Sequence, residues 1–134
     1  MSLEVSIIVP DRIFWKDKAK EIILPTLTGQ MGVLSNHISA LTGLDTGVMQ
    51  IKALNSEEWI NVVIMGGFAL IKNNQVTVLV NEAELGNDID SANAESTFLE
   101  AKSVLEKSVD GRQKVEATLQ FKKAKARFQV TKIN

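Results

Sequence analysis

The sequence predicts an α+β fold in which a small β domain, built as a sandwich or a barrel, is followed by an antiparallel two-helix hairpin. Two observations support this prediction. Apolar residues recur at every second position in short runs before residue 86, and at steps of three and four residues after residue 90. The first period is that of strands and the second is that of helices. We place the domain boundary between the two patterns, giving a β domain over residues 1–86 and a hairpin over residues 87–134.

Short strands are expected throughout the β domain. Alternation and β-branched runs predict strands over residues 3–9, 19–24, 48–54, 59–65, 68–71 and 76–80, with a short apolar run at residues 13–15. Asn73-Asn74 is expected to turn the last hairpin, because asparagine tolerates the positive φ of tight turns. Residues 26–34 contain Gly29 and Gly32 and are interpreted as a turn or loop. Gly67 lies between two strand-like runs, which indicates a bulge or a close backbone approach.

Two helices are expected after the Gly86-Asn87-Asp88 link. Asp90 or Ser91 can cap the first helix by accepting hydrogen bonds from the free amides of its first turn. The first helix then presents one apolar face, and Asp110-Gly111 ends it. The second helix repeats the same spacing. The two faces consist of Ala94, Phe98, Ala101 and Leu105, and of Ala117, Phe121, Ala124 and Phe128.

The second helix carries a further apolar stripe, nearly opposite the first at about 100° per residue. Its members are Val115, Leu119, Ala126, Val130 and Ile133. One apolar face is enough to pair with the first helix, so the second face needs another surface. The sequence leaves two candidates open, the β domain and a partner protein.

The charges of the C-terminal third are segregated. Residues 82–110 carry eight acids and two lysines, whereas residues 112–134 carry seven basic residues and one acid. Such asymmetry indicates a charged partner for the basic segment, or mutual neutralisation of the two segments. The basic residues Lys122, Lys123, Lys125 and Arg127 fit three readings on spacing alone: nucleic-acid binding, an acidic protein partner, or a solvated helix face.

Composition argues against most catalytic classes. The chain has no cysteine, which excludes disulfides, thiolate metal sites and cysteine nucleophiles. His37 is the sole histidine and no nucleophile elbow accompanies it, so we expect a polar loop residue rather than a catalytic base. Clustered metal ligands and a phosphate-cradling loop are also missing from the sequence. No apolar run is long enough to span a membrane and no leader is recognisable, so a soluble, non-catalytic binding protein without cofactor or metal is expected.

A series of motifs runs through the chain in a fixed order. EIILP at residues 21–25 is followed by GQMGVLSNH at 29–37, MGGFA at 65–69, VLVNEAE at 78–84 and DID at 88–90. The set resembles the epsilon subunit of rotary ATP synthases, whose pattern is a strand followed by G-x-x-G-x-L-P-N-H. The resemblance covers essentially the whole chain and is to the chloroplast and cyanobacterial branch.

This resemblance implies a β-sandwich followed by a helical hairpin that lies folded or extends. It implies a non-catalytic central-stalk subunit that couples rotation to ATP synthesis and inhibits ATP hydrolysis through its C-terminal helices. The implied partners are the gamma subunit, the c-ring and the beta subunit of the synthase, with no nucleic acid. The implied location is the stromal face of the chloroplast thylakoid membrane, or the cytoplasmic face of a cyanobacterial thylakoid, peripheral to the membrane through the complex.

The resemblance also assigns roles to individual positions. The loop Thr28, Gly29, Gln30, Met31, Gly32 and Val33 matches the ring-facing loop of the family. Asn36 and His37 match its gamma-proximal pair. The basic residues at positions 122, 123, 125 and 127 match the stretch that faces acidic residues of the beta subunit.

Two positions depart from the family pattern. Ser35 stands where the family has proline before Asn-His, which removes a rigid φ. Asn93 stands where ATP-binding bacterial members have arginine in I/L-D-x-x-R-A, so a cation able to pair with phosphate is lost. We therefore expect no ATP binding by the folded hairpin.

Overall fold

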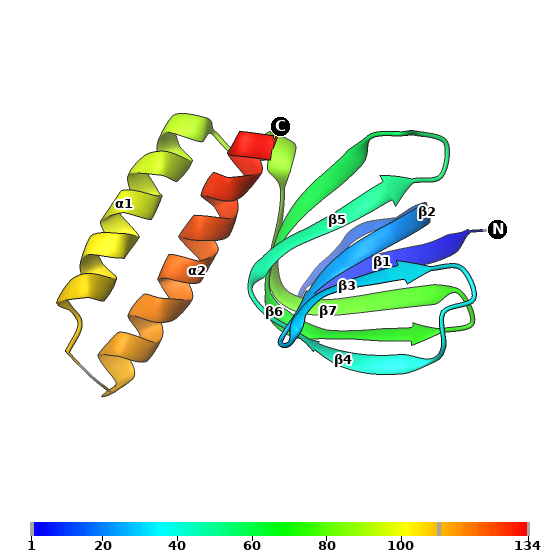
Figure 1. The fold of residues 1–134 in the computed structure, drawn as a ribbon, viewed down its shortest axis with the longest axis horizontal. Coiled ribbons are helices and arrows are strands. Elements are labelled where there is room, and N and C mark those ends of the chain that lie inside the picture. Colours follow the sequence, from blue (N-terminus) through cyan, green and yellow to red (C-terminus); the bar gives the residue numbers. More distant parts are fainter. Residues whose placement is uncertain (1, 110, 134) are drawn as a thin grey trace.

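The β domain and the two helices lie side by side, with helix α2 between helix α1 and the sheet (Figure 1). The computed structural model describes residues 2–109 and 111–133, and the α+β prediction is confirmed within them. The elements are β1 (Leu3–Val9), β2 (Arg12–Thr26), β3 (Gly29–Leu34), β4 (Ala40–Leu44), β5 (Gly47–Ala53), β6 (Trp59–Lys72), β7 (Gln75–Leu85), the 3₁₀ turn η1 (Gly86–Asp88), α1 (Ser91–Lys107) and α2 (Gly111–Ile133).

Strand pairing closes the β domain into a flattened sandwich. Antiparallel pairs join β1 to β2, β2 to β5, β5 to β6 and β6 to β7, and a parallel pair joins β7 back to β1. Strand β3 pairs with β2, and β4 pairs mainly with β6. Closure satisfies the backbone groups that an open sheet leaves at its edges. Apolar side chains fill the interior, and the alternation predicted for residues 3–9 buries Leu3, Val5, Ile7 and Val9.

Three sequence expectations about the strands were incomplete. The two segments at residues 13–15 and 19–24 belong to one strand, β2, which passes through Pro25 and ends at Thr26. The proline lies next to the strand end, where one missing amide hydrogen is tolerated, and its carbonyl accepts from the amide of Asp45 (2.8 Å). The runs at 59–65 and 68–71 likewise form one strand, β6. Strand β4 was not predicted at all.

The segment 26–34, interpreted as a turn or loop, is mostly strand. Only Leu27 and Thr28 form the turn, and β3 begins at Gly29. The glycines suggested a loop, but Gly29 is needed for the turn itself, where its φ is 123°. Gly32 faces open space within β3, so that strand tolerates it.

Glycine 67 lies where β6 leaves its partner β5 and begins to pair with β4. Its φ is 151°, and a Cβ added there would lie 2.0 Å from the carbonyl oxygen of Leu79 in β7. The prediction of a close backbone approach is therefore confirmed. The Asn73-Asn74 turn is confirmed as well, with φ of 51° and 62° at the two residues.

We expect Gly67→Ala to lower the free energy of unfolding by about 3 kcal/mol, because the new Cβ both clashes with β7 and strains the backbone. Urea unfolding followed by the fluorescence of Trp15 and Trp59, both in the β domain, measures the loss. The matched control is Gly32→Ala, whose Cβ would meet nothing within 4 Å and which should change stability by less than about 1 kcal/mol. Equal losses in the two variants would contradict the close-approach argument.

Candidate functional site

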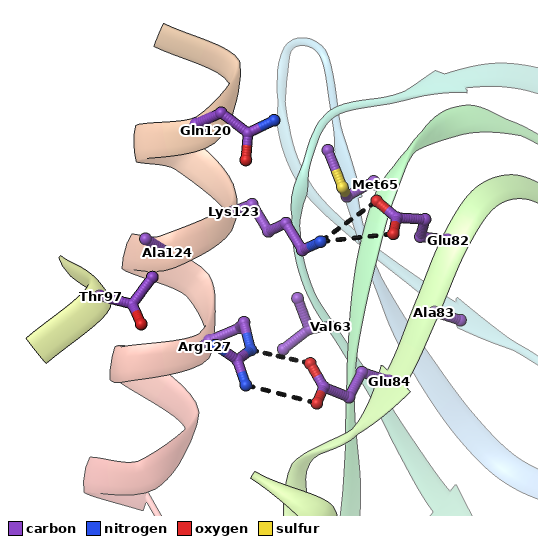
Figure 2. Close-up of a pocket in the computed structure, with 10 residues that line it drawn as sticks. All are labelled: Val63, Met65, Glu82, Ala83, Glu84, Thr97, Gln120, Lys123, Ala124 and Arg127. Carbon is purple, nitrogen blue, oxygen red and sulfur yellow. Dashed lines mark hydrogen bonds and ion pairs between the residues drawn. The ribbon is translucent and has the colours of Figure 1, made fainter. Parts of the chain in front are cut away.

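Three ion pairs join α2 to the β domain, and Figure 2 shows two of them, Lys123–Glu82 and Arg127–Glu84. Lys122 Nζ lies 3.2 Å from Asp45 Oδ1 in the β4–β5 turn. Lys123 Nζ lies 3.3 Å from both carboxylate oxygens of Glu82. Arg127 Nε donates to Glu84 Oε1 over 2.8 Å, and its terminal nitrogen donates to Oε2 over 3.5 Å. We call these three ion pairs the charged seam.

Matching periods bring the two sides of the seam into register. Glu82 and Glu84 are two residues apart on β7, so their side chains leave the same face of the strand about 6.8 Å apart. Lys123 and Arg127 are four residues apart on α2, which places them on one face with a rise of about 6 Å. The two spacings agree within an ångström, so each cation meets its own carboxylate. The pair Arg127–Glu84 is the least solvated, with 17% of the arginine side chain exposed.

A cleft lies along the seam, between α2 and strands β6 and β7. Figure 2 shows its lining: Val63, Met65, Glu82, Ala83, Glu84, Thr97, Gln120, Lys123, Ala124 and Arg127. Both cations of the cleft already face carboxylates of the same chain, so an anion would have to displace those carboxylates to bind there.

The start of α1 lies outside this cleft lining. Asn93 is exposed, and its backbone amide donates to the capping carboxylate of Asp90 (3.1 Å). The predicted cap is thereby confirmed, and Asp90 provides it.

Helix α2 buries two opposite faces. Toward α1, the ring of Phe98 stacks on Phe128 with centroids 5.0 Å apart and tilts against Phe121 at 5.5 Å. Toward the sheet, Ala126 and Val130 are buried together with Val63. Of the stripe opposite α1, the β domain thus covers Ala126 and Val130, whereas Ile133 at its end is 57% exposed.

The N-terminal half of that stripe has no cover within the described residues. Val115 is 60% exposed and Leu119 is 45% exposed, whereas Val130 is fully buried. The sequence left the β domain and a partner as alternative covers for this face. The folded structure covers Ala126 and Val130 with the β domain and leaves Val115, Leu119 and Ile133 exposed.

Of the four basic residues that the sequence singled out, three lie in the seam. Lys125 is exposed and has no ion pair among the described residues. Mutual neutralisation of the acidic and basic segments therefore accounts for the pairing of Lys123 and Arg127. It does not account for Lys122, because its partner Asp45 lies outside the acidic segment. Because three of these four cations are directed at carboxylates, the described part of the chain does not present the four as a continuous basic face for nucleic acid.

The residues 28–33, predicted to be a ring-facing loop, lie in the β2–β3 hairpin: Thr28 is in its turn and the others are in β3. Val33 is buried in the core, so it is not available at the surface. The hydroxyl of Thr26 donates to the carbonyl of Gly29 and stiffens the turn. Gln30 borders a groove next to Phe128 and Lys132, which places the turn close to the end of α2.

Asn36 and His37 lie at the other end of β3, in the connection to β4. Asn36 has a φ of 67°, and its amide donates to the side chain of Asn74 over 2.6 Å. His37 is only partly exposed, and its Nδ1 lies 2.7 Å from the carbonyl oxygen of Ile38. Six strand residues separate this turn from the β2–β3 turn, a length of about 20 Å, so the two sets of predicted contact residues face different surroundings.

One apolar surface was not predicted. Leu41 and Leu70 are direct cross-strand partners on β4 and β6, and Phe68 lies opposite Gly43 on the same pair. Leu27 lies over Gly43, within 2.8 Å of where a Cβ would be. These side chains, which we call the outer apolar face, are between 46% and 70% exposed. Contiguous exposed apolar side chains of this kind mark interaction surfaces. The alternation of Phe68 and Leu70 with Ala69 and Ile71, which are buried, was the signal available in the sequence.

The described residues include no group of three or more acidic or histidine side chains arranged for a metal ion. None of the described helices is long and apolar enough to cross a bilayer. Outside the seam, hydrogen bonds from Lys20 and then Lys52 lower the pKa of the Glu57 carboxyl from its ordinary value. This carboxylate is fully solvated and does not touch α2.

Comparison with known proteins gives matches over nearly the whole chain. The model described as ATP synthase, Delta/Epsilon chain, beta-sandwich domain matches residues 2–86, and the corresponding long alpha-helix domain matches residues 87–132. The ATP synthase epsilon chain, chloroplastic, of Chlorella vulgaris is 57% identical over 132 residues, covering 98% of this chain and 97% of the relative. The protein of the same description from Tupiella akineta is 55% identical, covering 97% and 98%.

A chain in the cryo-EM structure of the Euglena gracilis mitochondrial ATP synthase (OSCP/F1/c-ring, rotational state 1) has the same fold. The TM-score is 0.84, and the match covers 99% of this chain and 82% of the other. The sequence identity is 19%, so this likeness concerns the fold.

We expect Phe98→Ala to destabilise the hairpin by about 2 kcal/mol, because it removes both ring contacts that hold α1 on α2. Hydrogen exchange of the α1 and α2 amides measures the effect as faster exchange. Leu99→Ala is the control, since Leu99 is the neighbouring residue and is 56% exposed. If both variants exchanged at the same rate, the aromatic contacts would not hold the hairpin together.

Proposed function

This chain belongs to the ATP synthase delta/epsilon chain family, and we propose how its two parts divide the work of such a subunit. It is a non-catalytic, epsilon-type subunit of the central stalk of ATP synthase. Residues 1–86 are the part that attaches to the rotor and transmits torque, and residues 87–134 are a regulatory arm. Together they couple proton-driven rotation to ATP synthesis and restrain wasteful ATP hydrolysis.

The outer apolar face supports attachment to the gamma subunit. Leu41, Phe68 and Leu70 form an exposed surface that a monomeric protein would be expected to cover. Ile38, 78% exposed, joins this surface to the adjoining turn that holds Asn36 and His37. The gamma-proximal pair carried over from the family pattern therefore adjoins the exposed apolar Ile38, which precedes β4 and its Leu41.

The β2–β3 turn is proposed to contact the c-ring. Gly29 and Gly32 both face open space, so backbone at these positions is accessible to another surface without intervening side chains. Thr28, Gln30 and Met31 complete this contact. Val33, because it is buried, contributes by supporting β3 from within the core.

The helical hairpin is proposed to inhibit ATP hydrolysis by leaving the β domain and contacting the beta subunit. The observation that carries this proposal is the composition of the α2–sheet contact. Its apolar cluster is small, with Val63, Ile89, Ala94, Ala126 and Val130 buried and Val48 packed against them, and three ion pairs lie beside it. Exposed ion pairs contribute only about 0.2–1 kcal/mol each, so such a contact can open. Once raised, Lys122, Lys123, Lys125 and Arg127 would face an acidic partner together.

Nucleotide binding is not part of the proposed mechanism. Asn93 offers no cation for phosphate, and the cations of the cleft are already paired with Glu82 and Glu84. The descriptions of the relatives as chloroplastic support a chloroplast location. We propose the stromal face of the thylakoid membrane, where the chain would be held through the complex.

Deleting residues 89–134 should leave assembly intact and raise the rate of ATP hydrolysis, because the inhibitory arm is removed. The measurement is hydrolysis by synthase reconstituted with the truncated or the full chain, with co-elution of the gamma subunit as the check on assembly. Hydrolysis that stays unchanged in a fully assembled complex would remove the inhibitory role. Truncation exposes Val63, which α2 covers in the full chain. Hydrolysis is therefore compared only between complexes that contain the truncated or the full chain.

Leu41→Gln combined with Leu70→Gln should weaken binding to the gamma subunit at least tenfold, because two apolar side chains are lost from the centre of the contact. Titration of the gamma subunit with each chain measures the dissociation constant. The control is Leu99→Gln with Val104→Gln, an equal change on exposed positions of α1. Equal weakening by both pairs would contradict docking through the outer apolar face.

A further inference from the structure

The charged seam holds the same cations that the raised hairpin would offer to a partner. Lys122, Lys123 and Arg127 are directed at carboxylates of the β domain in the folded state. A cation cannot pair with Glu84 and with an acidic partner at once. We propose that Glu82 and Glu84 form an intramolecular latch, an acidic surface that competes with the partner for α2 and keeps the inhibitory arm folded. This inference rests on the proposed function of the hairpin.

Geometry makes the latch selective for one position of α2. Glu82 pairs with Lys123 and Glu84 pairs with Arg127. A register shift of one residue would bring the neighbouring side chains of α2 toward the sheet and direct both cations about 100° away from the carboxylates. The Arg127–Glu84 pair is the firmest member because a guanidinium binds a carboxylate through two donors. On α2 the apolar part of the contact consists of small side chains, Ala126 and Val130, which pack in one cluster with Val63 and Ile89 and fix the register less tightly than the ion pairs do.

If the latch exists, neutralising the acids and neutralising the cations should have opposite effects on the inhibition of ATP hydrolysis. Neutralising the cations of α2 would loosen the folded state but would also remove the charges that the partner binds. Neutralising Glu82 and Glu84 loosens the folded state alone. Changes to the acids should therefore strengthen inhibition, although the acids lie in the β domain and need not touch the catalytic head.

Asp45 is left unchanged in the test. Its Oδ1 also accepts a hydrogen bond from the amide of Thr46 (2.8 Å), so its replacement would disturb the β4–β5 turn. The test variant is Glu82→Gln with Glu84→Gln. Its matched control is Glu4→Gln with Glu58→Gln, two exposed carboxylates of the β domain without ion pairs among the described residues.

Opening of the hairpin can be measured with a single thiol, because the chain has no cysteine. Ala126→Cys places that thiol against the sheet, where Ala126 is 2% exposed. Its labelling rate reports how often α2 leaves the β domain, however rare the open state is. In the full chain we expect the latch variant to label about three to ten times faster than its parent, and the control variant to label at the parent rate. High salt should raise the labelling rate of the parent more than that of the latch variant, because salt screens the ion pairs that only the parent has.

A second thiol separates opening from unfolding. Ala117→Cys lies on the face toward α1, where Ala117 is 6% exposed, so it reacts when the two helices separate. We expect its labelling rate to be unchanged by the latch variant. Exchanging the charges of the pair, with Glu84→Arg and Arg127→Glu together, should give slower labelling at position 126 than Glu84→Arg alone. Faster labelling at position 117, or equal acceleration by latch and control variants, would overturn the latch.

Hydrolysis by the assembled synthase then separates the two proposals. If labelling at position 126 accelerates and hydrolysis falls, both the latch and the inhibitory arm are supported. If labelling accelerates and hydrolysis does not change, the latch stands and the proposed inhibitory role fails. If labelling at position 126 does not accelerate, the latch is overturned whatever the hydrolysis rate.

Discussion

The structure depends on one constraint: helix α2 carries apolar side chains on two opposite faces and packs through both, against α1 on one side and the β domain on the other. Phe121 and Phe128 occupy the face toward α1, and Ala126 and Val130 occupy the face toward the sheet. A helix with one apolar face would pair with α1 and would not pack against the β domain. Because α2 has two, the hairpin is drawn onto the sheet, and the charged side chains between the faces are brought to the carboxylates of β7.

That arrangement lets the same helix serve two states. Apolar burial against the sheet is small and the ion pairs are partly solvated, so the folded state is held without being locked. The uncovered half of the stripe, at Val115 and Leu119, remains available for a different contact. The β domain differs in this respect, because its closed strand pairing and continuous core leave no comparable freedom.

Local pattern predicted those parts of the fold that local physics governs. Alternation placed β1, the Asn73-Asn74 pair placed a hairpin turn, and steps of three and four placed both helices and their aromatic faces. The failures came where tertiary context overrides local signals. The strand predicted over residues 19–24 continues through Pro25 in β2, because the neighbouring strands satisfy the backbone around the proline. Glycines 29 and 32 suggested a loop, yet pairing with β2 makes that segment a strand.

For the candidate site, the sequence by itself determined which side chains carry charge and that Lys123 and Arg127, four residues apart, share a helical face, because residue spacing along a helix sets direction. It also determined that Asn93, at the start of the first helix, stands where a phosphate-pairing cation would be needed. The tertiary structure alone decided what the cations face. Asp45 and Glu84 are 77 and 43 residues away from Lys122 and Arg127. Pairing over such separations depends on how the helix packs on the sheet, and no local period along the chain records it.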